Sequence, residues 1–269
     1  MNRIEARMKQ LQEKQEKAFI TYMTAGLPDM EGMKAIIRAN EAAGCDVLEL
    51  GIPFSDPVAD GPVIQAASYK AICQGVNLKG VLKEVESLRA QGAEIPIAFM
   101  MYYNTILYYG VKAFVESCVN AGVDGLIIPD LPFEEQGELK AALLEAEKEK
   151  GCETPILIQL VSPVSAGRIP MILKDARGFV YCVSSMGVTG QAADFHKEIV
   201  NYLTKVKEVS PIPVMMGFGI RTAADVKPMK DIIDGAIVGS HFINLLEENN
   251  YSPTAAEEYV RTFKKELNM

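Results

Sequence analysis

The stretch Val47–Gly51 reads Val-Leu-Glu-Leu-Gly, and it has the length and apolar content of a buried β-strand apart from Glu49. A carboxylate at the end of an apolar strand is costly unless it is paired or protonated. We therefore expect the pKa of Glu49 to rise toward a range in which it both accepts and donates protons. A second carboxylate, Asp60, follows eleven residues later in the loop PFSDPVADGP of residues 53–62.

These two carboxylates predict acid–base chemistry that needs no metal. The alternative is structural: Glu49 forms an ion pair, and Asp56 or Asp60 caps a helix. The rest of the sequence helps to decide between these interpretations.

Short apolar runs like residues 47–51 recur along the chain, and amphipathic helical stretches lie between them. The eight runs are residues 19–24, 47–51, 97–101, 125–129, 156–159, 179–183, 214–217 and 236–239. Continuous apolar runs are typical of parallel strands that are buried on both faces. Eight strand–helix units in a chain of this length predict a closed (β/α)₈ TIM barrel, with an open doubly wound sheet as the alternative.

The first segment of the chain predicts an additional helix. Ile4, Met8 and Leu11 recur at helical spacing, so we expect an N-terminal helix that covers the barrel floor. Residues 43–47 and 121–125 repeat one helix-to-strand turn, in which a glycine ends the helix and an aspartate begins the next strand. Because no linker or low-complexity tract interrupts the chain, we expect residues 1–269 to form one domain.

The composition fits a soluble globular enzyme. The chain has 269 residues, of which 49% are hydrophobic and 23% charged, and its net charge of −8 argues against a nucleic-acid surface. The five cysteines are scattered without CxxC spacing, which indicates reduced thiols in the cytoplasm rather than disulfides or a zinc site. No apolar run is long enough to span a bilayer, so we expect neither export nor a membrane location.

Glycines follow the last three predicted strands, in residues 187–190, in residues 217–220 and at the Gly239-Ser240 pair. In a barrel, such loops and a helix N-terminus can bind phosphate, because bare backbone N–H groups approach the oxygens closely. For any one of these glycines the alternative is a purely geometric turn. Together they predict an anionic, phosphorylated substrate.

Absent residue types narrow the chemistry further. None of the predicted strands contains lysine, which argues against a Schiff-base aldolase. His196 and His241 are the only histidines, so a metal-dependent aldolase site is not expected. No GxGxxG motif follows the first strand, and no nicotinamide or flavin cofactor is predicted. The chemistry that remains is proton transfer between carboxylates and a phosphorylated substrate.

The motifs quoted above resemble those of the tryptophan synthase alpha subunit family over nearly the whole chain. The most specific is ELGIPFSDPVADGP at residues 49–62, followed by the glycine motifs at residues 187–190, 217–220 and 239–240. The resemblance implies a TIM barrel that cleaves indole-3-glycerol phosphate to indole and D-glyceraldehyde 3-phosphate in L-tryptophan biosynthesis. Alternatives are a stand-alone lyase for the same substrate, or a weakly catalytic allosteric activator of the beta subunit.

The resemblance also implies roles for individual residues. The implied catalytic residues are Glu49 and Asp60; the implied phosphate contacts are Gly190, Gly219, Gly239 and Ser240; the implied substrate pocket is Tyr22, Tyr102, Tyr181, Thr189 and Ile237.

The implied partner is a pyridoxal-phosphate-dependent beta subunit in an α₂β₂ heterotetramer, with no cofactor or metal in this chain. We expect residues 54–58 to pack against that partner, the alternative being that Phe54 folds back onto its own barrel.

Overall fold

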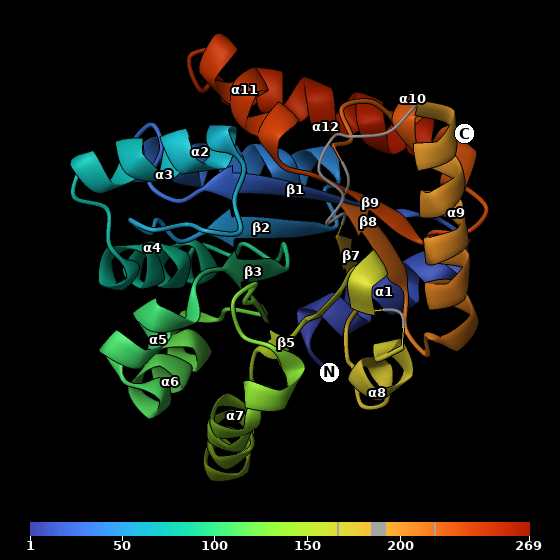
Figure 1. Cartoon of the computed structure of the whole chain (residues 1–269). Coiled ribbons are helices and arrows are strands. Elements are labelled where there is room, and N and C mark those ends of the chain that lie inside the picture. Colours follow the sequence, from blue (N-terminus) through green and yellow to red (C-terminus); the bar gives the residue numbers. More distant parts are fainter. Residues whose placement is uncertain (166, 184–191, 218) are drawn as a thin grey trace.

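The computed structural model describes residues 1–165, 167–183, 192–217 and 219–269, with the backbone alone for residues 192–196 (Figure 1). The strands are β1 Ala18–Thr24, β2 Val47–Gly51, β3 Ile97–Met100, β4 Gly125–Ile127, β5 Ile156–Leu157, β6 Gln159–Val161, β7 Val180–Val183, β8 Val214–Gly217 and β9 Gly235–Val238. The α-helices are α1 Arg3–Lys14, α2 Met30–Ala43, α3 Pro62–Cys73, α4 Leu78–Ala90, α5 Tyr103–Tyr109, α6 Val111–Ala121, α7 Gly137–Lys150, α8 Ile169–Leu173, α9 Ala192–Val209, α10 Ala223–Val226, α11 Ser240–Glu248 and α12 Pro253–Leu267. Short 3₁₀ turns are η1 Phe133–Glu135, η2 Pro163–Ser165 and η3 Lys227–Met229. No described helix combines the length and the apolar character needed to cross a membrane.

The strands form one sheet in the order β5-β4-β3-β2-β1-β9-β8-β7-β6, and every paired neighbour is parallel. Its two ends, β5 and β6, are separated in the chain by Ile158 alone. The predicted fifth strand is thus divided into two parts. The first part, β5, pairs with β4, and the second part, β6, pairs with β7. This closes the barrel and confirms the TIM-barrel prediction. The open doubly wound sheet is wrong, because such a sheet has two separate edges.

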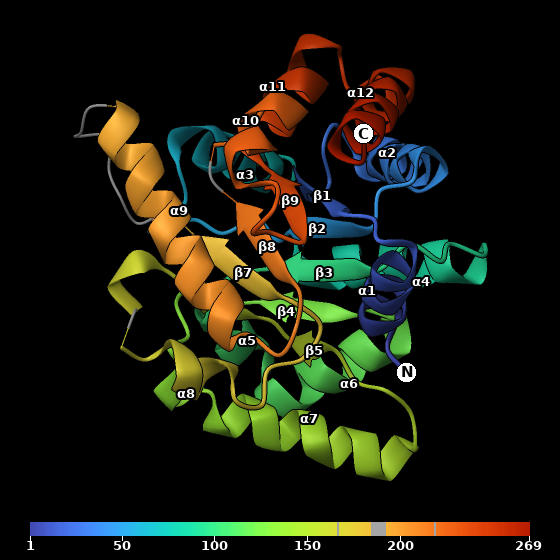
Figure 2. The same cartoon turned by 90° about the vertical axis from the view of Figure 1, so that its right-hand side faces the viewer.

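Strand β2 shows how the barrel separates its two layers. Leu48 and Leu50 belong to the cluster that packs against the surrounding helices, whereas Val47 belongs to the cluster inside the barrel. Because side chains alternate along a strand, Glu49 faces inward with Val47. Figure 2 shows the helices arranged around these strands.

Helix α1 covers the floor of the barrel, as the sequence predicts. Ile4, Met8 and Leu11 are buried in the interior cluster together with inward residues of the strands. A Cβ at Gly125 would lie 2.8 Å from Cδ1 of Ile4, so the glycine at the start of β4 leaves the room that Ile4 fills. The helix is therefore part of the core.

Three aspartates lie at the floor, each directly before a strand, and we call Asp46, Asp124 and Asp234 the floor aspartates. Each carboxylate accepts the backbone N–H of a residue at the start of the preceding strand in the barrel: Asp46 from Phe19 at 2.6 Å, Asp124 from Ile97 at 2.9 Å and Asp234 from Val214 at 2.8 Å. The sequence predicts that Asp46 and Asp124 begin strands in the turns 43–47 and 121–125. Their carboxylates thus also hold the register of the neighbouring strands β1 and β3.

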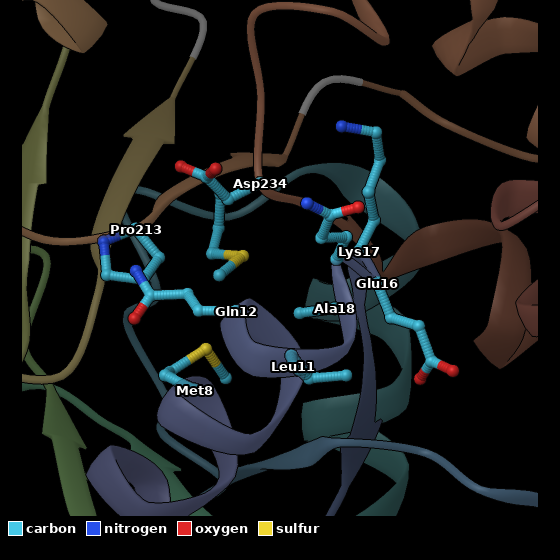
Figure 3. A pocket seen from close by; sticks show the side chains of 10 residues that line it. Met8, Leu11, Gln12, Glu16, Lys17, Ala18, Pro213 and Asp234 are labelled. Carbon is cyan, nitrogen blue, oxygen red and sulfur yellow. The ribbon is translucent and has the colours of Figure 1, made fainter.

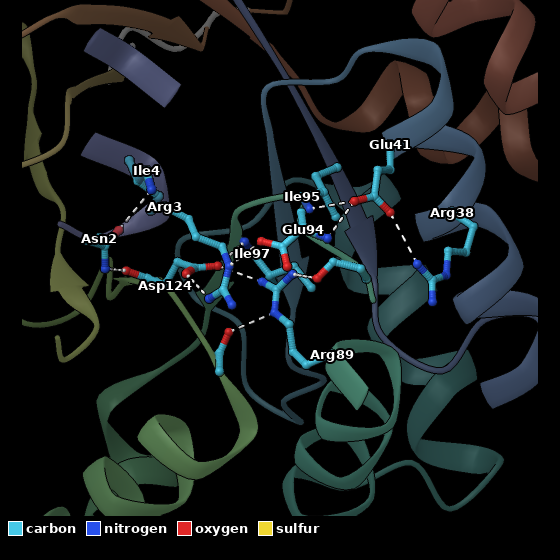
Figure 4. Close-up of polar contacts among 12 residues, drawn as sticks. Asn2, Arg3, Ile4, Arg38, Glu41, Arg89, Glu94, Ile95, Ile97 and Asp124 are labelled. Atoms are coloured by element: carbon cyan, nitrogen blue, oxygen red, sulfur yellow. Dashed lines mark hydrogen bonds and ion pairs between the residues drawn. The ribbon is translucent and has the colours of Figure 1, made fainter. Parts of the chain in front are cut away.

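Cations from the helices pair with these carboxylates, of which Asp46 and Asp124 are buried and Asp234 is half-buried. Asp46 pairs with Arg7 and Lys264, Asp124 with Arg3 and Arg89, and Asp234 with Lys207. Figure 4 shows the group around Asp124, in which Arg3 reaches the carboxylate from α1 and Arg89 from α4. Two arginines of α1 therefore tie that helix to the barrel floor.

We predict that Asp124→Ala destabilises the fold by about 3–5 kcal/mol, because it removes the carboxylate that pairs with the largely buried Arg89 and accepts the N–H of Ile97. Urea unfolding monitored by circular dichroism measures the change. The matched control is Glu145→Ala, which breaks the exposed pair with Lys112 and should cost less than about 1 kcal/mol. Equal losses in the two variants would contradict the anchoring role of Asp124.

Candidate active site

Glu49 lies inside the barrel between Tyr22 of β1 and Ala98 of β3, its partners in strand register. It is fully buried, and neither carboxylate oxygen has a hydrogen-bond partner among the described residues. Burial raises its pKa to about 8, and no neighbouring charge contributes to that shift. At neutral pH the group is therefore largely protonated and can both donate and accept a proton. The alternative of a structural ion pair is wrong for the described part of the chain.

Asp60 lies in the loop between β2 and α3 and is half-buried. Its Oδ2 accepts a hydrogen bond from the Tyr102 hydroxyl at 3.0 Å, and that hydroxyl accepts the Ala59 N–H at 3.0 Å. Burial raises the pKa of Asp60, and the bond from Tyr102 opposes the shift. Helix α3 begins after Gly61 without a side-chain cap, so the alternative that Asp60 or Asp56 caps this helix is wrong.

Tyrosines border the two carboxylates, and glycines make room for their rings. A Cβ at Gly51 would lie 2.5 Å from Cζ of Tyr22, and a Cβ at Gly217 would lie 2.7 Å from Cε1 of Tyr181. Each ring therefore lies against the end of the next strand of the barrel. After burial, the charges of nearby carboxylates are the main factors that raise the pKa of both hydroxyls, with Asp60 contributing to each.

The structure thus brings Tyr22, Tyr102 and Tyr181 together with both carboxylates. Tyr22, Asp60 and Tyr102 line one hollow at the carboxyl end of the strands. Ile237 of β9 lies deeper, in the interior cluster that also contains Tyr181. These positions come from five different strands or the loops that follow them, which is the usual construction of a barrel active site.

Phe54 packs within the chain. Its ring stacks on Tyr102 with a centroid separation of 4.9 Å, and its backbone N–H and C=O both bond the Ser68 hydroxyl. The alternative in which Phe54 folds back onto the barrel therefore holds for this side chain. Val58 in the same loop is 85% exposed and remains available to a partner.

Three of the predicted phosphate positions, Gly219, Gly239 and Ser240, lie at the same end of the barrel. Gly239 is the N-cap of α11 and Ser240 is its first residue, so the free N–H groups of this helix start beside the site. A Cβ at Gly239 would lie 3.8 Å from Cβ of Tyr22. Gly219 has φ of +53°, which favours glycine, and open space surrounds its missing Cβ. Thr189 and Gly190 lie outside the described residues.

His241 follows Ser240, but its ring contacts Tyr259 of α12 at 5.5 Å, edge to face. It therefore packs between helices. Sequence reasoning did not select Thr24 or Ser68 as site residues, although both line the hollow beside Asp60. For Thr24 a signal existed, since it lies two residues after Tyr22 and thus on the same face of β1.

A second hollow of about 250 Å³ lies at the opposite end of the barrel, between α1 and the starts of the strands (Figure 3). Met8, Leu11 and Met215 form its apolar part, and Lys17 and Asp234 lie at its polar part. Lys17 donates to the Ile233 carbonyl and Asp234 pairs with Lys207, so these charges stabilise the floor. This hollow is remote from Glu49 and Asp60.

Comparison with known proteins agrees with this geometry. The family model described as "Tryptophan synthase alpha chain" matches residues 8–269. The tryptophan synthase alpha chain of Lachnospira eligens is 65% identical over 268 residues and covers 100% of both chains, and that of Thermoanaerobacter sp. is 42% identical and covers 99% of this chain and 98% of its own.

Solved structures give the same result. The crystal structure of tryptophan synthase subunit alpha from Legionella pneumophila superposes with a TM-score of 0.86 at 32% identity, covering 99% of this chain and 98% of the other. A chain of tryptophan synthase from M. tuberculosis superposes with a TM-score of 0.84 at 31% identity, covering 100% and 99%. With its motifs, its closed barrel and its full-length match to these proteins, the chain belongs to the tryptophan synthase alpha chain family.

Proposed function

We propose that this chain is the lyase that cleaves indole-3-glycerol phosphate to indole and D-glyceraldehyde 3-phosphate in L-tryptophan biosynthesis. The observation that carries the proposal is Glu49, a fully buried carboxyl group without a partner among the described residues and with a pKa of about 8, which shares the neighbours Tyr22 and Tyr181 with the half-buried Asp60. A group with such a pKa is suited to transfer protons in both directions at neutral pH. The family supports the same reaction.

The reaction breaks the bond between C3 of the indole ring and the hydroxyl-bearing carbon of the glycerol chain. Protonated Glu49 donates its proton to C3, which gives a positively charged indolenine. The Glu49 carboxylate then removes the proton of the adjacent hydroxyl, the oxygen electrons form the aldehyde, and the carbon–carbon bond electrons return to the ring. Indole leaves, and Glu49 is protonated again, so the proton balance closes.

Asp60 has a different role in this mechanism. Its carboxylate accepts the indole N–H and stabilises the positive charge that develops on the ring after C3 is protonated. The Tyr102 hydroxyl, which donates to Oδ2 at 3.0 Å, favours the ionised form that this role requires. Two carboxyl groups in one site thus work in opposite protonation states because one has a donor and the other has none.

The remaining predicted residues bind the substrate. Tyr22, Tyr102, Tyr181 and Ile237 form the apolar slot for the indole ring, and resemblance adds Thr189. The phosphate lies at the N-terminus of α11, where Gly239 and Ser240 offer backbone N–H groups, with Gly219 in the loop after β8 and Gly190 added by resemblance.

We also propose that the chain works with a pyridoxal-phosphate-dependent beta subunit in an α₂β₂ assembly and holds no cofactor itself. The matched M. tuberculosis chain comes from a tryptophan synthase solved in an aminoacrylate-bound form, which supports this partner. Two exposed side chains lie at the catalytic rim. Val58 is 85% exposed in the Asp60 loop, which follows β2, and Tyr108 is 93% exposed on α5, which follows β3. Both are apolar surface suited to a protein contact.

The direct test is indole release from indole-3-glycerol phosphate by the purified chain, with and without a beta subunit. We predict that Glu49→Gln lowers kcat by at least about 10³-fold, because an amide of nearly the same shape cannot transfer protons. Glu41→Gln on α2 is the matched control and should keep parental turnover. Near-parental activity of Glu49→Gln would rule out the proposed mechanism, and parental rates unaffected by the beta subunit would favour a stand-alone lyase.

Burial of Glu49 should also appear in the stability of the protein. Because the folded-state pKa is raised from 4.5 to about 8, the stability contributed by the protonated group is complete below pH 4.5 and is lost as pH rises toward 8. Glu49→Gln does not lose this stability, because its amide does not ionise. We therefore predict that the variant equals the parent near pH 4.5 and exceeds it by several kcal/mol at pH 8, at about 1.4 kcal/mol per pH unit between them. Urea titrations at pH 5, 6.5 and 8 measure the difference, and a constant difference would contradict the prediction.

The phosphate assignment predicts a separate effect. Gly219→Val and Gly239→Val should raise KM for indole-3-glycerol phosphate at least about tenfold while changing the affinity for free indole little, because the side chains occupy space near the phosphate oxygens. Steady-state kinetics and indole titration give the two values. Gly137→Val at the exposed start of α7 controls for loss of a glycine. Equal KM for a dephosphorylated substrate would refute the assignment.

A further inference from the structure

Helix α3 follows the Asp60 loop, residues 52–61, and binds it near both ends. Near the start of the loop, the Ser68 hydroxyl accepts the Phe54 backbone N–H at 2.8 Å and donates to the Phe54 carbonyl at 3.0 Å. Near the end of the loop, the Gln65 side-chain amide donates to the Asp60 carbonyl at 2.8 Å. Gln65 and Ser68 lie three positions apart, so one face of the helix makes both contacts.

The two contacts differ in their surroundings. Gln65 is exposed, whereas Ser68 is 5% exposed and lines the hollow at the catalytic rim. The helix around Ser68 is packed against the barrel, because Ala67 and Ala71 are buried in one cluster with Tyr22. A hydroxyl in such a place holds its partner firmly, since water does not compete for its hydrogen bonds.

Phe54 transmits this support to Asp60 through Tyr102. The Phe54 ring stacks on the Tyr102 ring with a centroid separation of 4.9 Å and an interplanar angle of 23°. The Tyr102 hydroxyl accepts the Ala59 N–H and donates to Oδ2 of Asp60, each at 3.0 Å. Because packing restricts the torsions of a side chain, a fixed Phe54 restricts where the Tyr102 hydroxyl lies.

We propose that Ser68 is a positioning residue for Asp60: by holding the backbone of Phe54 on α3, its hydroxyl fixes the Tyr102 ring and with it the carboxylate that accepts the indole N–H. In this role Ser68 acts through Phe54 and Tyr102 and does not bind the substrate. The inference rests on the proposed lyase function and deepens it. A displacement of about 1 Å in a catalytic group lowers a rate up to about 10²-fold, so this support affects turnover.

The test removes the hydroxyl and then restores it. Ser68→Ala loses both bonds to Phe54 and should lower kcat for indole release about tenfold, within the range that a displaced catalytic group causes. KM should rise less than about threefold, because the phosphate contacts lie at α11 and the lost interaction acts on the transition state. Ser68→Thr keeps the hydroxyl and should recover most of the lost kcat.

Ser210→Ala is the matched control at the floor of the barrel. The Ser210 hydroxyl donates to the Ile212 carbonyl at 2.6 Å and accepts the Ile212 N–H at 3.3 Å, which is the pattern of bonds that Ser68 makes with Phe54. Both alanine variants should therefore unfold at a lower urea concentration than the parent. Only Ser68→Ala should lose kcat, and an equal loss in Ser210→Ala would overturn the positioning role.

A double variant tests the route through Tyr102. If Ser68 acts by fixing the Tyr102 hydroxyl, Ser68→Ala should add little to the loss of kcat caused by Tyr102→Phe, because that variant has no hydroxyl to position. Losses that multiply would show that the two residues act independently, and they would overturn the inference.

The parent and Asp60→Asn, assayed in parallel, distinguish failure of this inference from failure of the proposed function. An active parent, an impaired Asp60→Asn and a Ser68→Ala variant with parental kcat would overturn the role of Ser68 alone. A Ser68→Thr variant as slow as Ser68→Ala would do the same. A parent that releases no indole, alone or with a beta subunit, would overturn both proposals.

Discussion

Closure of the barrel around a dry interior is the constraint on which the rest of this structure depends. The ring closes where the strand around Ile158 divides, pairing with β4 before that residue and with β7 after it. Inside the ring, most inward-facing side chains of the strands are removed from water, whatever their chemistry, and Met100, Leu160 and Val183 are only partly buried. Helix α1 completes the enclosure from below, because Ile4 fills the space left by Gly125.

The same enclosure treats carboxylates at the two ends of the barrel in opposite ways. At the floor, Asp46 and Asp124 each accept a backbone N–H and pair with two cationic side chains. Burial raises the pKa of Asp124, and Arg89 and Arg3 oppose that shift. Toward the other end, Glu49 receives no donor from the described residues and is instead held protonated. The mechanism proposed above places proton transfer at this unfavourably buried group, and unpaired buried groups often occur at functional sites of folded proteins.

The loop that carries Asp60 is held by contacts within the chain. Phe54 stacks on Tyr102, Ser68 binds the backbone of Phe54 twice, and Tyr102 binds both Ala59 and Asp60. Tyr102 thus connects the end of β3 to the carboxylate through one hydroxyl. A partner that contacts the exposed Val58 would act on this network directly, which gives a physical route for coupling between subunits.

The sequence by itself determined the features that depend on local pattern. Eight apolar runs predict the barrel, the helical spacing of Ile4 and Leu11 predicts α1, and a carboxylate in an apolar strand predicts the raised pKa of Glu49, because periodicity and burial are properties of neighbouring residues. The glycine motifs pointed to the start of α11 for the same reason.

Only the tertiary structure decided which distant groups meet. Arg3 reaches Asp124 across 121 positions of the chain, Phe54 turns back onto Tyr102, and the Tyr102 hydroxyl reaches Asp60. Whether a buried polar group finds a donor depends on the packing of elements far apart in sequence, and no local pattern encodes that packing. The sequence therefore singled out Glu49 and Asp60, and the fold left Glu49 without a donor among the described residues while giving Asp60 the Tyr102 hydroxyl.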